Sequence, residues 1–383
     1  MWIIPGPGSL RFCKRPLVLR GLVFRSYATK TSDPLRILFC GSDEFSIAHL
    51  KALHAYHLKQ PERISSIDVV CRPGKRVGRG LKQIREVPLK AAASALSLPI
   101  HEIDTFTGWT PPTFPKGHIN LVIAVSFGLF VPPRILNGAK YGGLNVHPSL
   151  LPNFRGPAPL HHTLLAGETT TGVTVQTLHL KHFDHGVIIS QTPAPGFDIP
   201  NPESCTVPEL VDFVAPKGAQ MLVESIEKGL FVPPIENAGT VQTGKLKHAP
   251  KIIPEDRHIN WANWTLAEIN RRNRVIGPLW SKALCASNPA DGPLSFQHKR
   301  VILTDTEEVD PPKGCDSFSI LPGLPFTNAS HPSSQRILRI NRMKVEGEQD
   351  AEGLRAAIKA RMFGDRAFQY EGRDFTPFRN SLV

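Results

Sequence analysis

"LRILFCGSDEFSIAHLKALHAY", residues 35–56, is the stretch that decides the fold class. It begins with an apolar run of strand length, Gly41 marks a turn, and apolar residues then recur at helical spacing. Ser42 or Asp43 can cap the helix, because a short polar side chain accepts hydrogen bonds from the free N–H groups of a first helical turn. A buried strand, a tight turn and an amphipathic helix are typical of the opening unit of a parallel α/β sheet.

Three further β-branched runs extend this pattern. They are ISSIDVVC (residues 64–71), INLVIAVSF (119–127) and YGGLNVH (141–147). With helical stretches between them, they predict a doubly wound, mostly parallel, Rossmann-like sheet over residues 35–230. The first turn holds only one glycine, so the G-x-G-x-x-G fingerprint of dinucleotide binding is missing and a nicotinamide-dependent dehydrogenase is not favoured.

The composition changes after this predicted α/β domain. Residues 206–229 are predicted to form one amphipathic helix capped by Thr206, and residues 231–257 are rich in proline and glycine, as in a linker. From residue 258 to 383, short strand-like pieces around one helix predict a smaller β-rich domain. Within it, clustered Pro, Ser, Gly and acidic residues at 306–335 indicate a flexible insertion.

The charge of the chain is unevenly placed. The formal net charge is +12, and residues 1–30 contribute six basic residues and no acidic one. A segment that is rich in arginine, free of acid and mixed with apolar residues is typical of a mitochondrial transit peptide, which predicts a location in the mitochondrial matrix. A disordered basic arm is the alternative. A secretory signal is less favoured, because arginines interrupt the apolar stretches.

Cysteine spacing and hydropathy argue against other classes of protein. The six cysteines include no C-x-x-C pair, which favours reduced thiols over a disulfide framework or a zinc site. No uninterrupted apolar run has the length of a membrane span, so we expect no membrane partner. His179, His182 and His185 recur every three residues, but their surroundings favour a loop, and we expect no metal site there.

The chemistry of the chain centres on residues 143–160, GLNVHPSLLPNFRGPAPL. Asn145 and His147 lie two apart on a predicted strand, so their side chains share one face at the carboxyl end, where ligands bind in open α/β sheets. An amide donor and an imidazole that converge can stabilise an oxyanion, and the imidazole can move a proton. Asp184 could orient that imidazole. No G-x-S-x-G elbow is present, so attack on a carbonyl by an external nucleophile is favoured.

The same stretch resembles the folate-dependent formyltransferase family. N-x-H-P-S-L-L-P from Asn145 to Pro152 and R-G-x-x-P from Arg155 are followed by T-G-V-T at Thr171 and D-x-G at Asp184. The resemblance implies a formyltransferase fold with a smaller, OB-like β-barrel at the C-terminus, 10-formyltetrahydrofolate as formyl donor, and no metal. It also implies roles for seven residues: Asn145, His147 and Asp184 in catalysis, and Ser149, Leu150, Leu151 and Pro152 in lining the folate site.

The family resemblance leaves the formyl acceptor open among tRNA, a purine precursor, a nucleotide sugar and water. A glycine-punctuated basic stretch, residues 71–90, can shape itself to phosphates and resembles an inserted loop of the family. The β-rich C-terminal domain and the predicted transit peptide also favour initiator methionyl-tRNA, because organellar translation starts with formylmethionine. The tRNA contacts that we expect are Arg72, Lys75, Arg76, Arg79, Lys82, Arg271 and Arg274.

A hypothesis from another class is a non-catalytic RNA-binding protein on a relic of the same fold. The intact set of Asn145, His147 and Asp184 argues against it. We therefore expect a monomeric enzyme whose partners are folate and tRNA.

Overall fold

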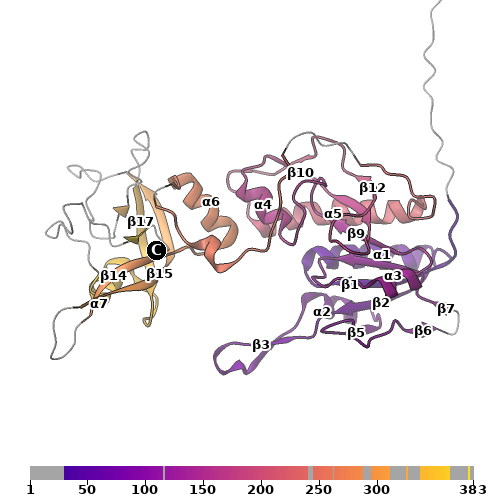
Figure 1. Cartoon of the computed structure of the whole chain (residues 1–383), viewed down its shortest axis with the longest axis horizontal. Coiled ribbons are helices and arrows are strands. Elements are labelled where there is room, and N and C mark those ends of the chain that lie inside the picture. The colour runs from indigo at the N-terminus through magenta and orange to yellow at the C-terminus, as the bar shows by residue number, and fades with distance from the viewer. Residues whose placement is uncertain are drawn as a thin grey trace, which may run out of the picture.

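The computed structural model describes most of the chain (Figure 1). The described residues are 30–114, 117–239, 245–261, 263–287, 295–310, 325–326, 337–362 and 378–379. All but the last residue of the predicted transit peptide, and most of the predicted insertion at 306–335, lie outside these ranges.

The first domain is built on a seven-stranded sheet. Its strands are β1 (Leu35–Gly41), β2 (Ile64–Cys71), β5 (Ile100–Glu102), β8 (Leu121–Val125), β9 (Gly143–His147), β11 (Thr174–Thr177) and β12 (Ile188–Gln191). Their spatial order is β12-β11-β9-β8-β1-β2-β5. The pairs from β5 to β9 are parallel, and β11 is antiparallel to both of its neighbours. The predicted doubly wound, mostly parallel sheet is confirmed.

Helices pack on both faces of this sheet (Figure 1). They are α1 (Glu44–Lys59), α2 (Pro88–Ala95), α3 (Pro133–Gly138), α4 (Pro159–Leu165) and α5 (Val207–Glu227). Ile37 and Phe39 of β1 are buried with α1, α4 and α5, whereas Leu38 and Cys40 are buried with α3. Because side chains alternate across a strand, these two clusters lie on opposite faces. We call them the α1/α4/α5 face and the α3 face.

Local sequence signals explain where two of these helices begin. The carboxylate of Asp43 caps α1 and accepts a hydrogen bond from the Ser46 N–H at 3.0 Å. Thr206 and Glu209 form a reciprocal capping box at the start of α5, and these hydrogen bonds hold the pKa of the Glu209 carboxyl below its usual value. The helix predicted over 206–229, with Thr206 at its cap, is confirmed.

A basic hairpin leaves the sheet after β2. It contains β3 (Lys75–Val77), the short 3-10 turn η1 (Arg79–Leu81) and β4 (Gln83–Arg85). In Figure 1 it extends away from the sheet on the side where the second domain lies. We call residues 72–86 the basic hairpin.

The other short strands of the first domain form two antiparallel pairs. These are β6 (Thr113–Phe114) with β7 (Gly117–His118), and β10 (Thr170–Thr171) with β13 (Phe197–Asp198). In the sequence, β10 lies between α4 and β11, whereas β13 follows β12.

The second domain contains one antiparallel sheet, with the order β16-β17-β15-β14-β19 and with β18 on β17. Its elements are η2 (Pro254–Arg257), α6 (Leu266–Ile276), β14 (Trp280–Ser287), β15 (Ser295–Val309), β16 (Pro325–Phe326), β17 (Ile337–Val345), β18 (Ala351–Glu352), α7 (Gly353–Ala360) and β19 (Phe378–Arg379). Register shifts between Leu303 and Thr306 mark bulges in β15, which bend a strand as a barrel-like sheet requires. The smaller β-rich domain is confirmed.

Three features of the second half differ from the sequence prediction. β14 and α7 were not predicted, because WSKALCAS does not alternate clearly and GLRAAIKA is only two turns long. β15 continues to Val309, beyond the predicted start of the insertion at residue 306.

Among the helices of the described residues, none is long and apolar enough to cross a membrane.

Part of the predicted linker packs along the loop that follows β9. The Phe154 N–H donates to the carbonyl of Lys247 at 2.6 Å, and the Ala249 N–H donates to the carbonyl of Arg155 at 2.8 Å. A Cβ atom on Gly156, which has a φ of +123°, would collide with the carbonyl oxygen of Ala249. The segment after α5 thereby supports the loop that carries Arg155 and Gly156.

Candidate active site

Asn145 and His147 lie at the carboxyl end of β9, between β8 and β11. Leu144 and Val146 belong to the buried cluster of the α1/α4/α5 face. Because side chains alternate along a strand, Asn145 and His147 project toward the α3 face. The Asn145 amide donates from Nδ2 to the carbonyl of Ala124 at 2.9 Å. One amide hydrogen is thus held by the neighbouring strand, and the amide plane is set before a ligand binds.

Asp184 comes from the loop between β11 and β12 and meets His147. Its Oδ1 lies 3.4 Å from His147 Nδ1, and the two side chains are 11% and 6% exposed. The other carboxylate oxygen accepts a hydrogen bond from the Gly156 N–H at 2.9 Å, and the Asp184 carbonyl accepts one from Arg155 Nε at 2.7 Å. The structure therefore brings the three predicted residues together, although Asp184 is far from the others in the sequence.

The imidazole of His147 is held at both nitrogens. Nδ1 faces Asp184, and Nε2 lies 2.9 Å from the carbonyl oxygen of Phe154, which has a left-handed backbone with φ of +58°. A carbonyl oxygen can only accept, so Nε2 carries a hydrogen and acts as a donor. The ring is a donor whose plane is fixed in advance, as an oxyanion site requires.

Gln176 of β11 was missed by the sequence prediction. Its Oε1 accepts from the Gly186 N–H at 3.1 Å, so its Nε2 must point the other way, where it donates to Asn145 Oδ1 at 3.1 Å and Asp184 Oδ1 at 3.3 Å. The side chain is buried, and β11 pairs Gln176 directly with Asn145. The only signal in the sequence was its place two residues after T-G-V-T. We call Asn145, His147, Gln176 and Asp184 the polar quartet.

The glycine of the D-x-G motif permits this arrangement. A Cβ atom on Gly186 would collide with the carbonyl oxygen of Thr177 at the end of β11. Only glycine allows the loop to return so close to its own strand. The close return lets the Gly186 N–H reach Gln176 and leaves Asp184 beside His147.

The polar quartet lines a cavity of about 510 Å³ at the carboxyl edge of the sheet. One wall comes from the α3 face and includes Phe127, Leu129 and Val131. The other wall comes from the α1/α4/α5 face and includes Phe45, Leu160 and Val211. Mostly apolar walls around a few convergent polar groups are typical of small-molecule sites.

Asp43 is a second residue that the sequence prediction did not place in the site. Besides capping α1, it lines the cavity at the junction of β1 and β8, where the order of the sheet reverses. Burial raises the pKa of its carboxyl, and hydrogen bonds from the Ser46 N–H and the Ser126 side chain partly offset that rise. Ser126 follows β8 with a φ of +48°, so both strands that flank the reversal contribute to this edge.

Ser149, Leu150, Leu151 and Pro152 form the turn after β9 but do not line the cavity. The Ser149 hydroxyl donates to the carbonyl of Asn153 at 2.8 Å, and the Leu151 N–H donates to Thr174 Oγ1 at 3.2 Å. Leu150 packs so closely on Gly172 that a Cβ atom there would collide with it. The turn holds β9 against β11. Its contact with folate stays a prediction.

The basic hairpin presents most of its predicted tRNA contacts to solvent. Lys75, Arg76 and Lys82 are exposed, and Arg79 lies in η1. Arg72, at the base, pairs with Asp104 at 3.3 Å.

Arg271 and Arg274, the other predicted tRNA contacts, lie on α6 where it packs against the first domain. Arg274 Nε donates to the carbonyl of Cys205 at 3.1 Å, and Arg271 pairs with Glu268 while its guanidinium lies near Gly167. These arginines join the two domains, and their contact with tRNA stays a prediction.

The loop that contains Asp184 carries three imidazoles, those of His179, His182 and His185. The rings of His179 and His182 stack with centroids 5.4 Å apart, and both residues line the cavity. Burial lowers the pKa of the His185 imidazole, and nearby basic groups lower it further. Within the described residues, no group of three or more His, Cys, Asp or Glu side chains is arranged to hold a metal ion.

Comparison with known proteins places these features in context. A model of the formyl transferase family matches residues 35–198. Mouse mitochondrial methionyl-tRNA formyltransferase is 34% identical over 269 residues, which is 70% of this chain and 64% of the mouse protein, so the match spans less than two thirds of that relative. The mitochondrial enzyme of Saccharomyces cerevisiae is 32% identical over 286 residues, 66% of this chain and 70% of the yeast protein.

A solved structure of an N-formyltransferase from Helicobacter canadensis, in complex with folinic acid and dTDP-3-aminofucose, is also similar. It is 16% identical, with a TM-score of 0.44, and the match covers 70% of this chain and 95% of that one.

Proposed function

The chain belongs to the methionyl-tRNA formyltransferase family of formyl transferases, and from that premise we propose that it transfers the formyl group of 10-formyltetrahydrofolate to the α-amino group of initiator methionyl-tRNA. The observation that carries the proposal is the polar quartet. It provides two hydrogen-bond donors, from Asn145 and His147, and one carboxylate, Asp184, at the edge of one cavity. Such a set fits the addition of an amine to a carbonyl.

The reaction begins with the neutral amine, because α-amino groups titrate near pH ~8 and only the neutral form is a nucleophile. The amine nitrogen bonds to the formyl carbon, and the carbonyl electrons move to oxygen. Asn145 has spent one of its two amide hydrogens on Ala124, and the other is left for this oxyanion. His147 donates from Nε2 once the oxyanion takes the place of the Phe154 carbonyl.

Collapse of the intermediate breaks the bond between the formyl carbon and N10 of the folate. The departing nitrogen takes up a proton while the attacking amine loses one, so no net acid or base is consumed. Asp184, at 3.4 Å from Nδ1, stabilises His147 while the proton moves. Gln176 acts through the others, because it fixes the orientation of the Asn145 amide and the Asp184 carboxylate.

The donor fits the wall of the cavity on the α3 face. Phe127, Leu129 and Phe130 offer apolar surface for a flat pterin ring, and Phe183 meets Phe130 edge to face at 5.3 Å. Asn145 and His147 project toward this face, so the formyl group of a donor bound there would lie beside them.

The basic hairpin fits the acceptor. Lys75, Arg76 and Lys82 are exposed on a two-stranded arm that leaves the first domain after β2. Among the described residues, none of the three forms an ion pair with an acidic side chain. Phosphates of an RNA stem would supply the opposite charge.

A mitochondrial matrix location is part of the proposal. It is supported by the basic, acid-free composition of residues 1–30 and by relatives that are named mitochondrial. Deleting residues 2–30 should leave formyl transfer intact in vitro and prevent import into mitochondria in cells. A truncated chain that still reaches mitochondria would remove this part of the proposal.

The test of the reaction is direct. Purified protein is incubated with donor that carries a labelled formyl group and, in parallel, with charged initiator tRNA, free methionine, a purine precursor, a nucleotide sugar or no acceptor. We expect label on methionyl-tRNA alone. Label on another acceptor, or release as formate, would replace the proposed acceptor, and no transfer at all would favour a non-catalytic role.

A further inference from the structure

The linker between the two domains pairs with the loop that follows β9, as a short extra strand would. The Phe154 N–H donates to the carbonyl of Lys247 at 2.6 Å, and the Ala249 N–H donates to the carbonyl of Arg155 at 2.8 Å. We call residues 247–250 the brace. The brace follows α5 in the sequence and lies outside the seven-stranded sheet that carries the polar quartet.

The brace is also tied to α4. The Lys247 ammonium pairs with Glu168 in the loop after α4, and Nε2 of His162, on α4, donates to the carbonyl of Pro250 at 3.0 Å. Ala249, between these two contacts, is fully buried. The brace is therefore held at both of its ends, although it belongs to a linker.

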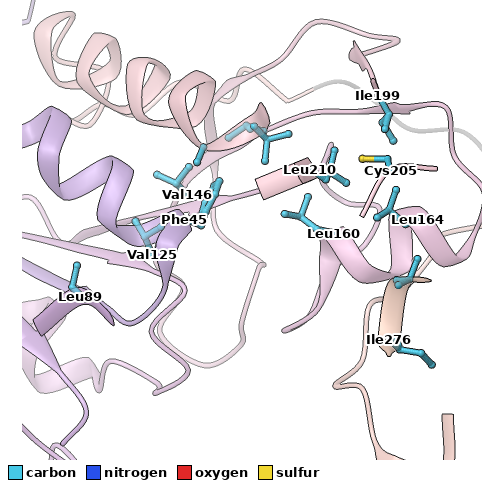
Figure 2. Packing of buried hydrophobic residues seen from close by; sticks show 14 of the residues in the cluster. Phe45, Leu89, Val125, Val146, Leu160, Leu164, Ile199, Cys205, Leu210 and Ile276 are labelled. Carbon is cyan, nitrogen blue, oxygen red and sulfur yellow. The ribbon is translucent and has the colours of Figure 1, made fainter. Parts of the chain in front are cut away.

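The helix α4 gives the brace a packed support. Leu160 and Leu164 of α4 lie in the same buried cluster as Leu210 of α5 and Ile276, the last residue of α6 (Figure 2). α4 also contacts α6 of the second domain. Because the brace leads into the second domain and is tied to α4, the packing of the two domains sets where the brace lies.

The residues that contact the brace also hold two members of the polar quartet. The Phe154 carbonyl accepts the hydrogen bond of His147 Nε2 at 2.9 Å. The Gly156 N–H and Arg155 Nε donate to the carboxylate and the carbonyl of Asp184, at 2.9 Å and 2.7 Å. One layer of backbone therefore separates the brace from the polar quartet.

The backbone of this layer needs such support. Phe154 has a left-handed φ of +58°, and Gly156 lies so close to the Ala249 carbonyl that a Cβ atom would collide with it. A residue other than glycine keeps a left-handed conformation only where its neighbours fix it. The Lys247 carbonyl fixes the N–H of Phe154, and His147 contacts the Phe154 carbonyl. Loss of the brace would leave that carbonyl free to turn away from the imidazole.

Resting on the proposed function, we propose that the brace is a positioning element for the reaction: its backbone hydrogen bonds align His147 and Asp184 for formyl transfer. The brace itself touches no substrate in the proposed reaction. A shift of about 1 Å in a positioned group can lower a rate by about 100-fold, so a change in the brace should lower kcat while the binding of both substrates is kept. The linker then does more than join two domains, because it completes the alignment of the polar quartet.

The test removes one N–H of the brace in the full-length protein. Ala249→Pro deletes the donor to the Arg155 carbonyl, whereas Ala249→Gly keeps that donor and changes only the side chain. We expect kcat for formylation of methionyl-tRNA to fall by about 10-fold or more in Ala249→Pro and to stay within about threefold of wild type in Ala249→Gly. KM for methionyl-tRNA and KM for the folate donor should stay within about twofold in both variants.

A matched proline control lies in the same linker. Ala238→Pro also removes an N–H, which donates to the carbonyl of Ile188 at 2.8 Å, but neither of these residues lines the cavity. Its kcat should stay within about threefold of wild type. If Ala249→Pro lacks a cooperative melting transition, an ester in place of the Ala249 amide removes the same donor with little change of shape, and the same loss of kcat is expected.

The ring of His147 gives a second readout, which does not depend on turnover. Its Nε2 proton, assigned by its absence from His147→Ala, is observed by NMR in protein that contains isotope-labelled histidine. We expect this signal to move upfield in Ala249→Pro, because the hydrogen bond to the Phe154 carbonyl lengthens. It should stay in place in Ala249→Gly and Ala238→Pro.

The outcomes separate the brace from the proposed function. If wild type formylates methionyl-tRNA but a folded variant without the Ala249 N–H keeps its kcat, the brace is overturned and the reaction stands. An equal loss of kcat in Ala238→Pro, or a loss in Ala249→Pro without movement of the His147 signal, would overturn the brace as well. If wild type formylates no acceptor, the proposed function fails, and the His147 signal alone decides whether the brace positions the ring.

Discussion

In the polar quartet, His147 exposes 6% of its side chain and Asp184 exposes 11%, and each member is bonded to backbone or to another member. In the basic hairpin, Leu81 and Ile84 expose 56% and 58% of their surface. The pairing of β3 with β4 and the ion pair of Arg72 with Asp104 at the base hold the arm. The first region fixes atoms in place, and the second presents charge. Substitutions in the two regions should therefore alter different kinetic constants.

The largest effect on kcat should come from removing a hydrogen-bond donor of the polar quartet. His147→Ala and Asn145→Ala should each lower kcat by about 10²-fold or more, because each removes one hydrogen bond to the oxyanion. The affinity for the formyl donor, 10-formyltetrahydrofolate, should change little in a binding titration. Turnover near that of the wild type in either variant would exclude that residue from the reaction.

A smaller loss of kcat should follow from changing Gln176, which touches no substrate in our account. Gln176→Met keeps the length of the side chain but frees the Asn145 amide and the Asp184 carboxylate, so kcat should fall by about 10-fold. KM for methionyl-tRNA should be unchanged. Gln220→Met is the matched control, because Gln220 is exposed on α5 and its side chain donates a hydrogen bond to Glu224 on the same helix. An equal loss in the control would contradict a positioning role for Gln176.

Removing charge from the basic hairpin should have a different signature. Replacing Lys75, Arg76 and Lys82 together by alanine should raise KM for methionyl-tRNA several-fold, and each lost phosphate contact should flatten the salt dependence of tRNA binding by about one unit of slope. Folate binding should not change. Lys51 and Lys59 are exposed on α1, and their replacement by alanine provides a control that removes two positive charges away from the hairpin. A salt slope equal to that of the wild type would make the hairpin an ordinary solvated surface.

The smallest effect concerns pH. His49 is buried behind Phe45, and its Nδ1 lies 2.7 Å from the carbonyl oxygen of Phe45. Burial lowers the pKa of the His49 imidazole to about 4. The basic hairpin contains no histidine and should add nothing to this effect. The unfolded chain binds a proton near the ordinary histidine pKa and the folded chain does not, so stability falls as pH falls. Between pH 7 and 6 the free energy of unfolding should drop by about 0.7 kcal/mol from this residue. Urea unfolding of wild type and His49→Leu would check it, since the variant should lose this part of the pH dependence.

The sequence was sufficient to predict the features that depend on local pattern. The strand and turn of residues 35–41, the cap of α5 at Thr206 and the shared face of Asn145 and His147 all follow from periodicities of two or 3.6 residues and from capping chemistry. Asp184 was located by a family motif, and its distance from His147 became known only from the fold.

The features that depend on strand register could not be predicted in this way. Gln176 reaches Asn145 because β11 pairs antiparallel with β9 in one register, and a shift of one residue would turn it to the other face. Asp43 joins the cavity because β1 and β8 are neighbours, a fact of topology. Arg274 donates to the carbonyl of Cys205 because α6 packs against the first domain in one particular way. The positive charge of Arg274 in the sequence could not predict that contact.

The most direct test of the division between the two regions is a single-turnover measurement. Formyl transfer is followed at saturating methionyl-tRNA for wild type, His147→Ala and the triple variant of Lys75, Arg76 and Lys82. Saturation removes any binding defect, so we predict a rate within about threefold of wild type for the hairpin variant and at least about 100-fold lower for His147→Ala. Equal losses in the two variants, or an unchanged rate in His147→Ala, would contradict the assignment of chemistry to the polar quartet and of tRNA binding to the basic hairpin.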